Sequence, residues 1–512
     1  MAKSETRKLF IQASHYSIAS LFTQVIGGLV TFPTLTRVFS VEQYGGLSFV
    51  GATLALALAF GKTGVQHSVV RLFAPITAGK SEFTLPQLYS TTIFGMGLSA
   101  TVAGVFLIGF ALLAPQSFLG HAGVRLPLAL VSILLVIQAT DSGVSNLLRA
   151  AERSALLMKY QVGKKYLGIA LILGGLLLVS RSLTAFYAAS IIAEGFSLSL
   201  LLAHALRGRA LISPKNFSKA LYVQVITYGL PMMIGYELSG AILSLGDRYV
   251  IKGVLGDEQL GLYSAAYNMC QYIGSAVVYA FSQAVMPVYM RMASQEGYEK
   301  ASAFTTRSLG HYLLMVTPVV AGVASIGPYL LPALASAKYA PAAAVLPWVI
   351  GGMAIDGVSN FLGAGLYIER HPRMLMGLTT GSAVFNVGLN ALLVPRLGIV
   401  GAAAATLVCY LAMCIAYAIA GGRYMRVRMP WATQARAAVG AIAMYAVLRF
   451  VEFDGLLVTV VARCVAGAFV YGTVIVAIDA EARLIVRNAI EVVQRRLGRK
   501  PAGPGAVGGG AG

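Results

Sequence analysis

The sequence predicts an all-α protein that crosses a membrane many times, and two observations lead to this prediction. Hydrophobic residues make up 57% of the 512 positions and charged residues 11%, whereas roughly 25% of a soluble domain is charged. Apolar stretches of bilayer length recur from one end of the chain to the other, with short connections between them. So few charged residues do not cover the surface of a soluble protein of this length. The soluble classes of protein are therefore excluded.

A bilayer-spanning helix needs roughly 20 mainly apolar residues, and fourteen stretches are expected to form such helices. The first seven are Leu9–Leu35, Tyr44–Val65, Leu88–Leu113, Val124–Leu148, Tyr160–Val179, Leu183–Leu206 and Leu221–Leu245. The second seven are Leu260–Met286, Leu309–Leu331, Ala342–Tyr367, Met374–Val394, Leu397–Ala420, Ala437–Val451 and Leu456–Ile478. The first stretch is too long for a signal peptide and is expected to be an uncleaved span.

The distribution of basic residues predicts the orientation. The chain carries 39 Lys and Arg against 19 Asp and Glu. With a cytoplasmic N-terminus, 29 basic residues fall in inner segments and 8 in outer loops, while Lys62 and Arg463 fall inside spans. Because cytoplasmic loops are enriched in Lys and Arg, both termini are expected in the cytoplasm, which requires an even number of spans. The same rule explains most of the charge excess, so no nucleic-acid partner is expected.

Two short segments recur at a nearly constant spacing, which indicates an internal duplication. Glu42-Gln43-Tyr44-Gly45 and Ser48 match Glu258-Gln259-Leu260-Gly261 and Ser264 at an offset of 216, and the turns around Arg181 and Arg396 match at an offset of 215. Parallel halves of this kind are a common transporter architecture. The expected units are residues 1–210 with spans 1–6, residues 211–422 with spans 7–12, residues 423–480 with spans 13 and 14, and residues 481–512. The last unit is expected to be a basic interfacial helix that contacts membrane lipid, followed by a linker-like tail.

Polar residues line one face of the eighth expected span, where lipid would not tolerate them. Ser264, Asn268, Gln271, Ser275 and Ser282 follow helical spacing, with Tyr267 and Tyr279 alongside. The first span carries a weaker version with Gln24 and Thr31. Hydrogen bonding between helices is the alternative explanation, because Ser, Thr and Asn commonly join membrane helices. The length of the stripe in the eighth span favours the lining of a polar path.

Ionisable groups inside spans mark pathways or buried pairs. The candidates are Lys62, Asp141, Glu194, Glu237, Asp356 and Arg463. Glu237 and Asp141 are candidates for coupling to H⁺ or Na⁺, with a locally paired or neutral carboxyl as the alternative. A path lined by cations, tyrosines, amides and hydroxyls suits an amphiphile with an anionic linker and a glycan head, because cations attract phosphate.

Several activities are disfavoured by residues that the chain lacks. Both candidate nucleotide-binding loops, at Gly61-Lys62-Thr63 and Gly79-Lys80-Ser81, lack the opening glycine of the phosphate-binding motif. The four cysteines have no metal-ligand spacing, so no metal or other cofactor is expected. No nucleophile and base are arranged for catalysis, so no enzymatic activity is expected.

Several segments resemble bacterial polysaccharide flippases of the Wzx type, in the superfamily that also holds lipid II flippases and multidrug (MATE) exporters. The resemblance is carried by Gly246-Asp247-Arg248-Tyr249-Val250-Ile251, Leu260 to Tyr267, Tyr228-Gly229-Leu230-Pro231, Asn386 to Ala404, and Arg37 followed by Glu42-Gln43-Tyr44-Gly45. It implies two six-helix lobes in a V around a cationic cavity, with two further C-terminal helices. Spans 1, 2, 7 and 8 would line the cavity, so the implied substrate-binding cations are Lys62, Arg37, Arg248 and Lys252.

The resemblance further implies a function in the bacterial inner membrane. The cargo would be an undecaprenyl-pyrophosphate-linked oligosaccharide, moved by alternating access to the outer leaflet for exopolysaccharide or O-antigen synthesis, beside a polymerase and a chain-length regulator. A lipid II flippase, a cation-coupled drug exporter and a membrane glycan polymerase remain the alternatives. The lipid II branch typically places an Arg deep in span 1, where this chain has Gln24 and Thr31.

Overall fold

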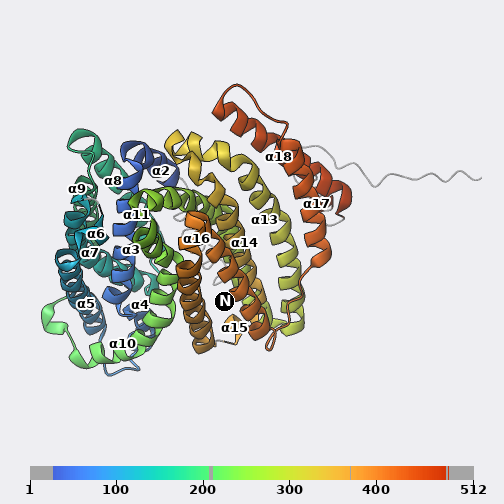
Figure 1. The fold of residues 1–512 in the computed structure, drawn as a ribbon. Coiled ribbons are helices and arrows are strands. Elements are labelled where there is room, and N and C mark those ends of the chain that lie inside the picture. Colours follow the sequence, from blue (N-terminus) through green and yellow to red (C-terminus); the bar gives the residue numbers. More distant parts are fainter. Residues whose placement is uncertain (1–26, 121, 207–211, 370, 480–481, 484–512) are drawn as a thin grey trace, which may run out of the picture.

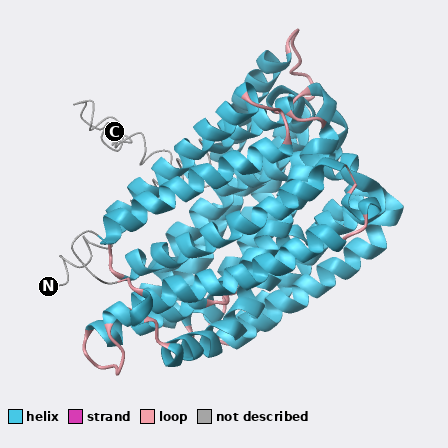
Figure 2. Cartoon of the chain, turned by 90° about the vertical axis from the view of Figure 1, so that its left-hand side faces the viewer, coloured by secondary structure: helices cyan, strands magenta, loops and turns pink. Residues whose placement is uncertain are grey.

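The computed structural model describes residues 27–120, 122–206, 212–369, 371–479 and 482–483. All regular secondary structure in these ranges is helical (Figure 2). The prediction of an all-α fold is therefore confirmed. The predicted interfacial helix, the start of the first span and Gln24 lie outside the described residues.

The first expected lobe contains one helix for each predicted span, and the second of these is broken. Its helices are α2 (Gly27–Val38), α3 (Val41–Lys62), α4 (Val65–Thr77), α5 (Leu85–Leu113), α6 (Gln116–Leu119), α7 (Arg125–Ala150), α8 (Ser154–Leu178) and α9 (Leu183–Leu206), with a short 3₁₀ turn at Ala122–Val124. Ser40 caps α3 in a reciprocal pair with Gln43. The second span divides into α3 and α4 because Thr63 and Gly64 both adopt the left-handed conformation, with φ of 47° and 71°.

The second expected lobe contains longer helices with internal breaks. Its helices are α10 (Lys219–Met232), α11 (Ser239–Gly274), α12 (Ala280–Gln295), α13 (Tyr298–Leu334), α14 (Leu346–Leu362), α15 (Ala364–Ile368) and α16 (Pro372–Gly421). Two π-helices, η4 (Met233–Leu238) and η5 (Ser275–Tyr279), join α10 to α11 and α11 to α12. Short 3₁₀ segments are η3 (Pro214–Asn216) and η6 (Ala337–Val345). η4 follows Pro231, which has no N–H for the regular helical ladder.

The number of passes follows from two glycines inside these long helices. At 1.5 Å per residue, a straight α16 of 50 residues would be about 75 Å long, far more than a bilayer. Gly398 in α16 and Gly256 in α11 have positive φ, and each divides its helix into two passes. Ten described helical segments are long and apolar enough to span a membrane, and two of these hold such a pair of passes. With α17 and with α2, which is the described part of the first predicted span, the described residues account for the fourteen predicted passes.

The last two spans form a hairpin at the edge of the molecule (Figure 1). α17 (Trp431–Leu448) and α18 (Leu456–Ile478) pack against α13. Arg463 of α18 is buried, and its guanidinium donates to the carbonyls of Val451 at 2.8 Å and Ser325 at 3.0 Å. It also lies over the ring of Tyr329 at 4.1 Å. This intramembrane cation therefore fastens the hairpin to α13 and does not line a path.

Candidate functional site: a cavity between two seams

The two lobes meet along α3 and α11 in a contact that we call the Gly45 seam. A Cβ on Gly45 would lie 1.9 Å from the carbonyl oxygen of Asp257, and a Cβ on Gly261 would lie 1.9 Å from that of Val41. Only glycine allows the two backbones to approach this closely. Each glycine and the carbonyl it faces have counterparts 216 residues away, so the repeated segments face each other in a local two-fold arrangement.

Arg248 links the lobes within the Gly45 seam. Its Nε donates a 3.0 Å hydrogen bond to Ser48 of α3, and its Nη1 donates to the carbonyl of Ser244 at 2.9 Å. The guanidinium lies 4.9 Å from the ring centre of Tyr267. Asp247 is 3.9 Å away at its Oδ1, which has no hydrogen-bond partner. The guanidinium is thus held from several sides at the wall of a cavity.

That cavity has a volume of about 410 Å³ and lies among α2, α3, α7, α8, α9 and α11. Most of its polar lining comes from groups that bind sugar hydroxyls well, and Arg248 is the one Lys or Arg among the described lining residues. These lining groups are Tyr44, Ser48, Gln138, Tyr187, Ser190, Glu194, Asn268 and Tyr272. Asn268 donates to the hydroxyl of Tyr44 at 2.9 Å, which joins the two lobes a second time. The cavity therefore has a cation on the α11 side and a carboxylate on the α9 side.

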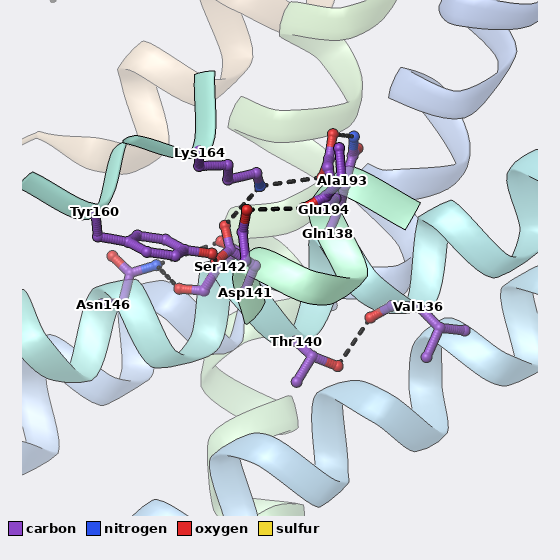
Figure 3. Close-up of polar contacts among 11 residues, drawn as sticks. Val136, Gln138, Thr140, Asp141, Ser142, Asn146, Tyr160, Lys164, Ala193 and Glu194 are labelled. Atoms are coloured by element: carbon purple, nitrogen blue, oxygen red, sulfur yellow. Dashed lines mark hydrogen bonds and ion pairs between the residues drawn. The ribbon is translucent and has the colours of Figure 1, made fainter. Parts of the chain in front are cut away.

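Behind Glu194 lies a charge cluster built from three helices of the first lobe (Figure 3). Lys164 of α8 lies 3.0 Å from Glu194 of α9 and 3.1 Å from Asp141 of α7. Tyr160 donates to the other oxygen of Asp141, and Gln138 donates to Glu194 at 3.0 Å. Asp141 is therefore paired, as the alternative reading of the sequence allowed. Lys164, which the orientation count assigns to an inner segment, lies inside the predicted fifth span.

A second contact between the lobes, the Gly64 seam, lies at the other end of the same span. It joins α4 to α10: a Cβ on Gly64 would lie 1.9 Å from the carbonyl oxygen of Gly229. Ser68 donates to the carbonyl of Val225 at 2.8 Å, and Arg71 lies 4.5 Å from the ring centre of Tyr228. Gly45 and Gly64 are about 28 Å apart along an ideal helix. The lobes are thus in contact near both ends of one membrane crossing.

Glu237 lies in η4 and faces the first lobe across the Gly64 seam. Its Oε1 is 3.6 Å from Nε2 of His67 in α4. The side chains of Gln66 and Lys62 also interact electrostatically with the carboxylate of Glu237. A π-helix holds an extra residue per turn and often marks a functional site. The sequence singles out Lys62 and Glu237 separately, and the structure brings them into one cluster.

The other two predicted cations have structural partners. Arg37 lies at the exposed end of α2, where it donates to the carbonyls of Ala333 at 2.9 Å and Pro33 at 3.3 Å. Lys252 is buried and forms an ion pair with Asp257. It also donates to the carbonyl of Leu119 at 3.0 Å. Neither residue lines the cavity.

The predicted polar stripe of the eighth span serves several different contacts. Asn268 lines the cavity and Tyr267 lies beneath Arg248, while Gln271 is exposed. Ser275 donates back to the carbonyl of Gln271 at 2.7 Å. η5 begins at Ser275 and changes the helical phase, so Tyr279 faces Asp356. Thr31 is half-buried in α2.

A second cavity of about 500 Å³ lies between α13, α14 and α17, and its lining is almost wholly apolar. Its walls include Leu313, Val316, Val358, Ile442 and Tyr445. Within the described ranges, no three His, Cys, Asp or Glu side chains are grouped so that they could hold a metal ion.

Sequence reasoning assigned no role to Lys164, His67 or Arg71. Lys164 sits at the start of a predicted span, where a lysine is usual near the lipid surface. His67 and Arg71 follow the predicted second span, but α4 extends the helix past them to Thr77. A membrane helix continuing through these polar residues is the signal that could have revealed them.

The profile of the family described as "Polysaccharide biosynthesis protein" matches residues 12–293, more than half of the chain. The chain belongs to this family. The probable low-salt glycan biosynthesis flippase Agl15 of Haloferax volcanii is 25% identical over 174 residues, which are 33% of this chain and 36% of that protein. The uncharacterized membrane protein MJ1068 of Methanocaldococcus jannaschii is 28% identical over 207 residues, 39% of each chain. These matches thus span less than two fifths of either relative.

Solved structures show the same fold. The lipid II flippase MurJ in an inward closed conformation aligns with a TM-score of 0.71 and 14% identity, covering 94% of this chain and 99% of that one. An inward-facing multidrug MATE transporter aligns with a TM-score of 0.64 and 16% identity, covering 80% and 97%. The predicted fold, with MATE-like lobes and a further C-terminal helix pair, is confirmed. This member of the polysaccharide biosynthesis family is a multi-pass membrane protein.

Proposed function

We propose that this member of the polysaccharide biosynthesis family is a flippase for lipid-linked oligosaccharides. The cargo would be an undecaprenyl-pyrophosphate-linked repeat unit, moved from the cytoplasmic to the periplasmic leaflet of the bacterial inner membrane for exopolysaccharide or O-antigen synthesis. The observation that carries the proposal is the polar cavity with Arg248 on its wall, because a cation among tyrosines, amides and hydroxyls suits a phosphate attached to sugars. The protein would act as a transporter and not as an enzyme.

The two seams support movement by alternating access. In the predicted orientation, with both termini in the cytoplasm, the Gly64 seam closes the cytoplasmic side and the Gly45 seam closes the periplasmic side. Opening one while the other stays closed would expose the cavity to one leaflet at a time. Arg248 and Lys62 are the proposed cargo-binding cations. Arg37 and Lys252 are left out because neither lines the cavity or lies at the Gly64 seam, and both have partners elsewhere.

The apolar cavity supports an amphiphilic cargo. It lies between α13, α14 and α17, away from the polar cavity. A polyprenyl chain gains free energy wherever its methylene groups leave water, at about 0.8 kcal/mol each. We propose that this cavity shelters part of the lipid chain while the headgroup occupies the polar cavity.

Glu237 is the proposed group for coupling to H⁺ or Na⁺. Its carboxylate faces His67 of the other lobe, so a change of its charge alters a contact between the lobes. Asp141 is the weaker candidate because Lys164 already neutralises it. Transport by Glu237→Gln is expected to lose its dependence on the ion gradient, and unchanged dependence would remove Glu237 from this role. A polymerase and a chain-length regulator are the proposed partners in the pathway.

The direct test is mass spectrometry of undecaprenyl-linked lipids from a deletion strain. We expect a pyrophosphate-linked oligosaccharide to accumulate and to resist glycosidase added from outside. Intact surface glycan with an unchanged lipid pool would contradict the proposal. Lysis on depletion would indicate a lipid II flippase, and drug sensitivity with normal glycan a drug exporter. Unlinked repeat units already exposed outside would indicate a polymerase.

Complementation of the deletion strain with variants tests the role of Arg248 in cargo binding. Arg248→Gln should fail to restore surface glycan, because it removes the one Lys or Arg that the described part of the chain places in the cavity lining. Arg396→Gln is the matched control, since Arg396 is exposed and bonds only to the carbonyl of Leu392 in its own helix. Equal activity of both variants would exclude Arg248 from cargo binding.

A further inference from the structure

The Gly64 seam places several basic side chains against a single acidic one. Lys62 ends α3, and His67 and Arg71 lie in the first two turns of α4. On the other lobe, Glu237 is the only acidic residue between Lys219 and Leu238. Its carboxylate is the one negative charge that this stretch offers to Lys62 and His67, whereas Arg71 lies over Tyr228.

The polar groups at this junction are incompletely satisfied. His67 Nε2 is enclosed and lacks a hydrogen bond, since its 3.6 Å distance to Glu237 is too long for one. Thr63 Oγ1, a hydroxyl that can donate, is likewise enclosed without a partner. The charge of Lys62 interacts with the carboxylate of Glu237 over a longer distance, but Lys62 forms no ion pair with any described residue. Buried polar groups without partners are unfavourable. The donors of this junction are therefore better matched by an acceptor with more charge and more oxygen atoms than one carboxylate.

We infer that this junction is an anion-exchange site, at which the diphosphate of the lipid-linked cargo replaces Glu237 as the partner of Lys62 and His67. The inference rests on the proposed function and extends it to the step of cargo entry. A diphosphate offers more acceptor oxygens and more negative charge than a carboxylate, so it outcompetes Glu237 for the same donors.

Exchange of the anion also changes the seam. When the diphosphate takes the basic groups, Glu237 loses its contact with the first lobe, and the lobes are then held there by the Gly64 approach, the Ser68 hydrogen bond and the Arg71 stacking. The cargo thereby weakens the barrier that it must pass. Without cargo, Glu237 keeps the seam closed, so the empty protein does not open a leak.

Inorganic pyrophosphate carries the same group without lipid or sugar and is the probe for this site. Spin labels are placed at Lys80→Cys in the first lobe and at Glu299→Cys in the second lobe, and their distance reports the separation of the lobes on the side of the Gly64 seam. Both positions are exposed and can therefore carry a label. The exposed Cys464 is replaced by Ser, while the other three cysteines are buried. The full-length protein in lipid nanodiscs is titrated with pyrophosphate and with sulfate at equal ionic strength, and distances are measured by pulsed electron spin resonance.

We expect pyrophosphate to increase the population with a longer distance and sulfate to have little effect. Glu237→Gln should show the longer distance without ligand and bind pyrophosphate at least about fivefold more tightly, a typical coupling between linked sites. Lys62→Gln and His67→Gln should lose the response. The control Glu296→Gln removes an exposed carboxylate that pairs only with Lys300, and it should behave as the parent protein. Should Glu237→Gln fail to fold, Glu237→Asp should give an intermediate effect.

Two results would overturn the inference: an equal response to sulfate, or unchanged pyrophosphate affinity in the Glu237 variants. Failure here is distinguishable from failure of the proposed function. Oligosaccharide flipping without any pyrophosphate response removes the exchange site alone. A pyrophosphate response in a protein whose deletion leaves the lipid-linked pool unchanged removes the flippase proposal alone.

Discussion

Ser264 donates a 2.7 Å hydrogen bond to Ser48, and the two serines are 216 positions apart in the chain. They are equivalent positions of the repeated segment, so the lobes meet through the same residue of each repeat. The glycines three residues earlier, Gly45 and Gly261, face each other in the same way. An interface between equivalent surfaces is self-complementary, as in a two-fold dimer. A duplicated chain can thereby close one end of its cavity with a single short motif.

A disulfide between these positions should lock the Gly45 seam. We expect Ser48→Cys/Ser264→Cys to cross-link under mild oxidation, because the two hydroxyl oxygens are already in contact. Surface glycan export should stop when the cross-link forms and recover with a reductant, if the seam has to open in each cycle. Gel mobility after cleavage between the lobes measures the cross-link, and Ser48→Cys alone is the control. Full export with a complete cross-link would exclude opening at this seam.

Gly261→Ala should prevent the Gly45 seam from closing. The added Cβ would lie 1.9 Å from the carbonyl oxygen of Val41, and a backbone atom cannot rotate away. Overpacking of this kind costs about 1–3 kcal/mol. We expect a lower unfolding temperature in detergent and loss of the Ser48–Ser264 cross-link. Gly253→Ala is the control on the same helix, because a Cβ there has no neighbour within 4 Å. Equal unfolding temperatures would contradict the close approach.

Lys252 should act on stability and not on cargo. Lys252→Gln removes the lysine that pairs with the buried Asp257, and loss of one partner of a buried ion pair costs about 3–5 kcal/mol. Adding Asp257→Asn should restore much of the stability, because no buried charge then remains. Unfolding temperature and export per folded molecule are the two measurements. If the Lys252→Gln protein were stable but exported less glycan, the prediction would be wrong and Lys252 would be a cargo-binding residue.

The cluster around Lys164 should behave as one unit. Lys164→Met leaves the carboxylates of Asp141 and Glu194 without a cation in the interior of the first lobe, so we expect strong destabilisation. The triple variant with Asp141→Asn and Glu194→Gln should be much more stable than Lys164→Met alone. Thermal unfolding of the three single variants and the triple variant measures the coupling. Additive effects would show that the three charges act independently.

Some predicted residues could be located from the sequence but not assigned a role. Arg37 and Lys252 were expected in the cavity because they lie at the ends of cavity-lining spans. Their partners are the carbonyls of Ala333 and Leu119, which are far away in the sequence. Similarly, Tyr279 follows the stripe of Asn268 in an ideal helical projection, but η5 turns it towards Asp356. A hydrophobicity pattern contains neither carbonyl positions nor a local change of helix type.

The membrane class, the helical spans, the repeated segments and the family resemblance can all be recognised from the sequence. Each depends on local composition or on short motifs, because a bilayer imposes length and polarity on every helix separately. The pairing of charges, in contrast, is visible only in the folded protein. Each pair joins residues of different helices: Lys164 with Asp141, Arg248 with Ser48, and His67 with Glu237. His67 lies just after the helix break at Thr63-Gly64. Such pairings depend on helix packing in three dimensions, which no local pattern specifies.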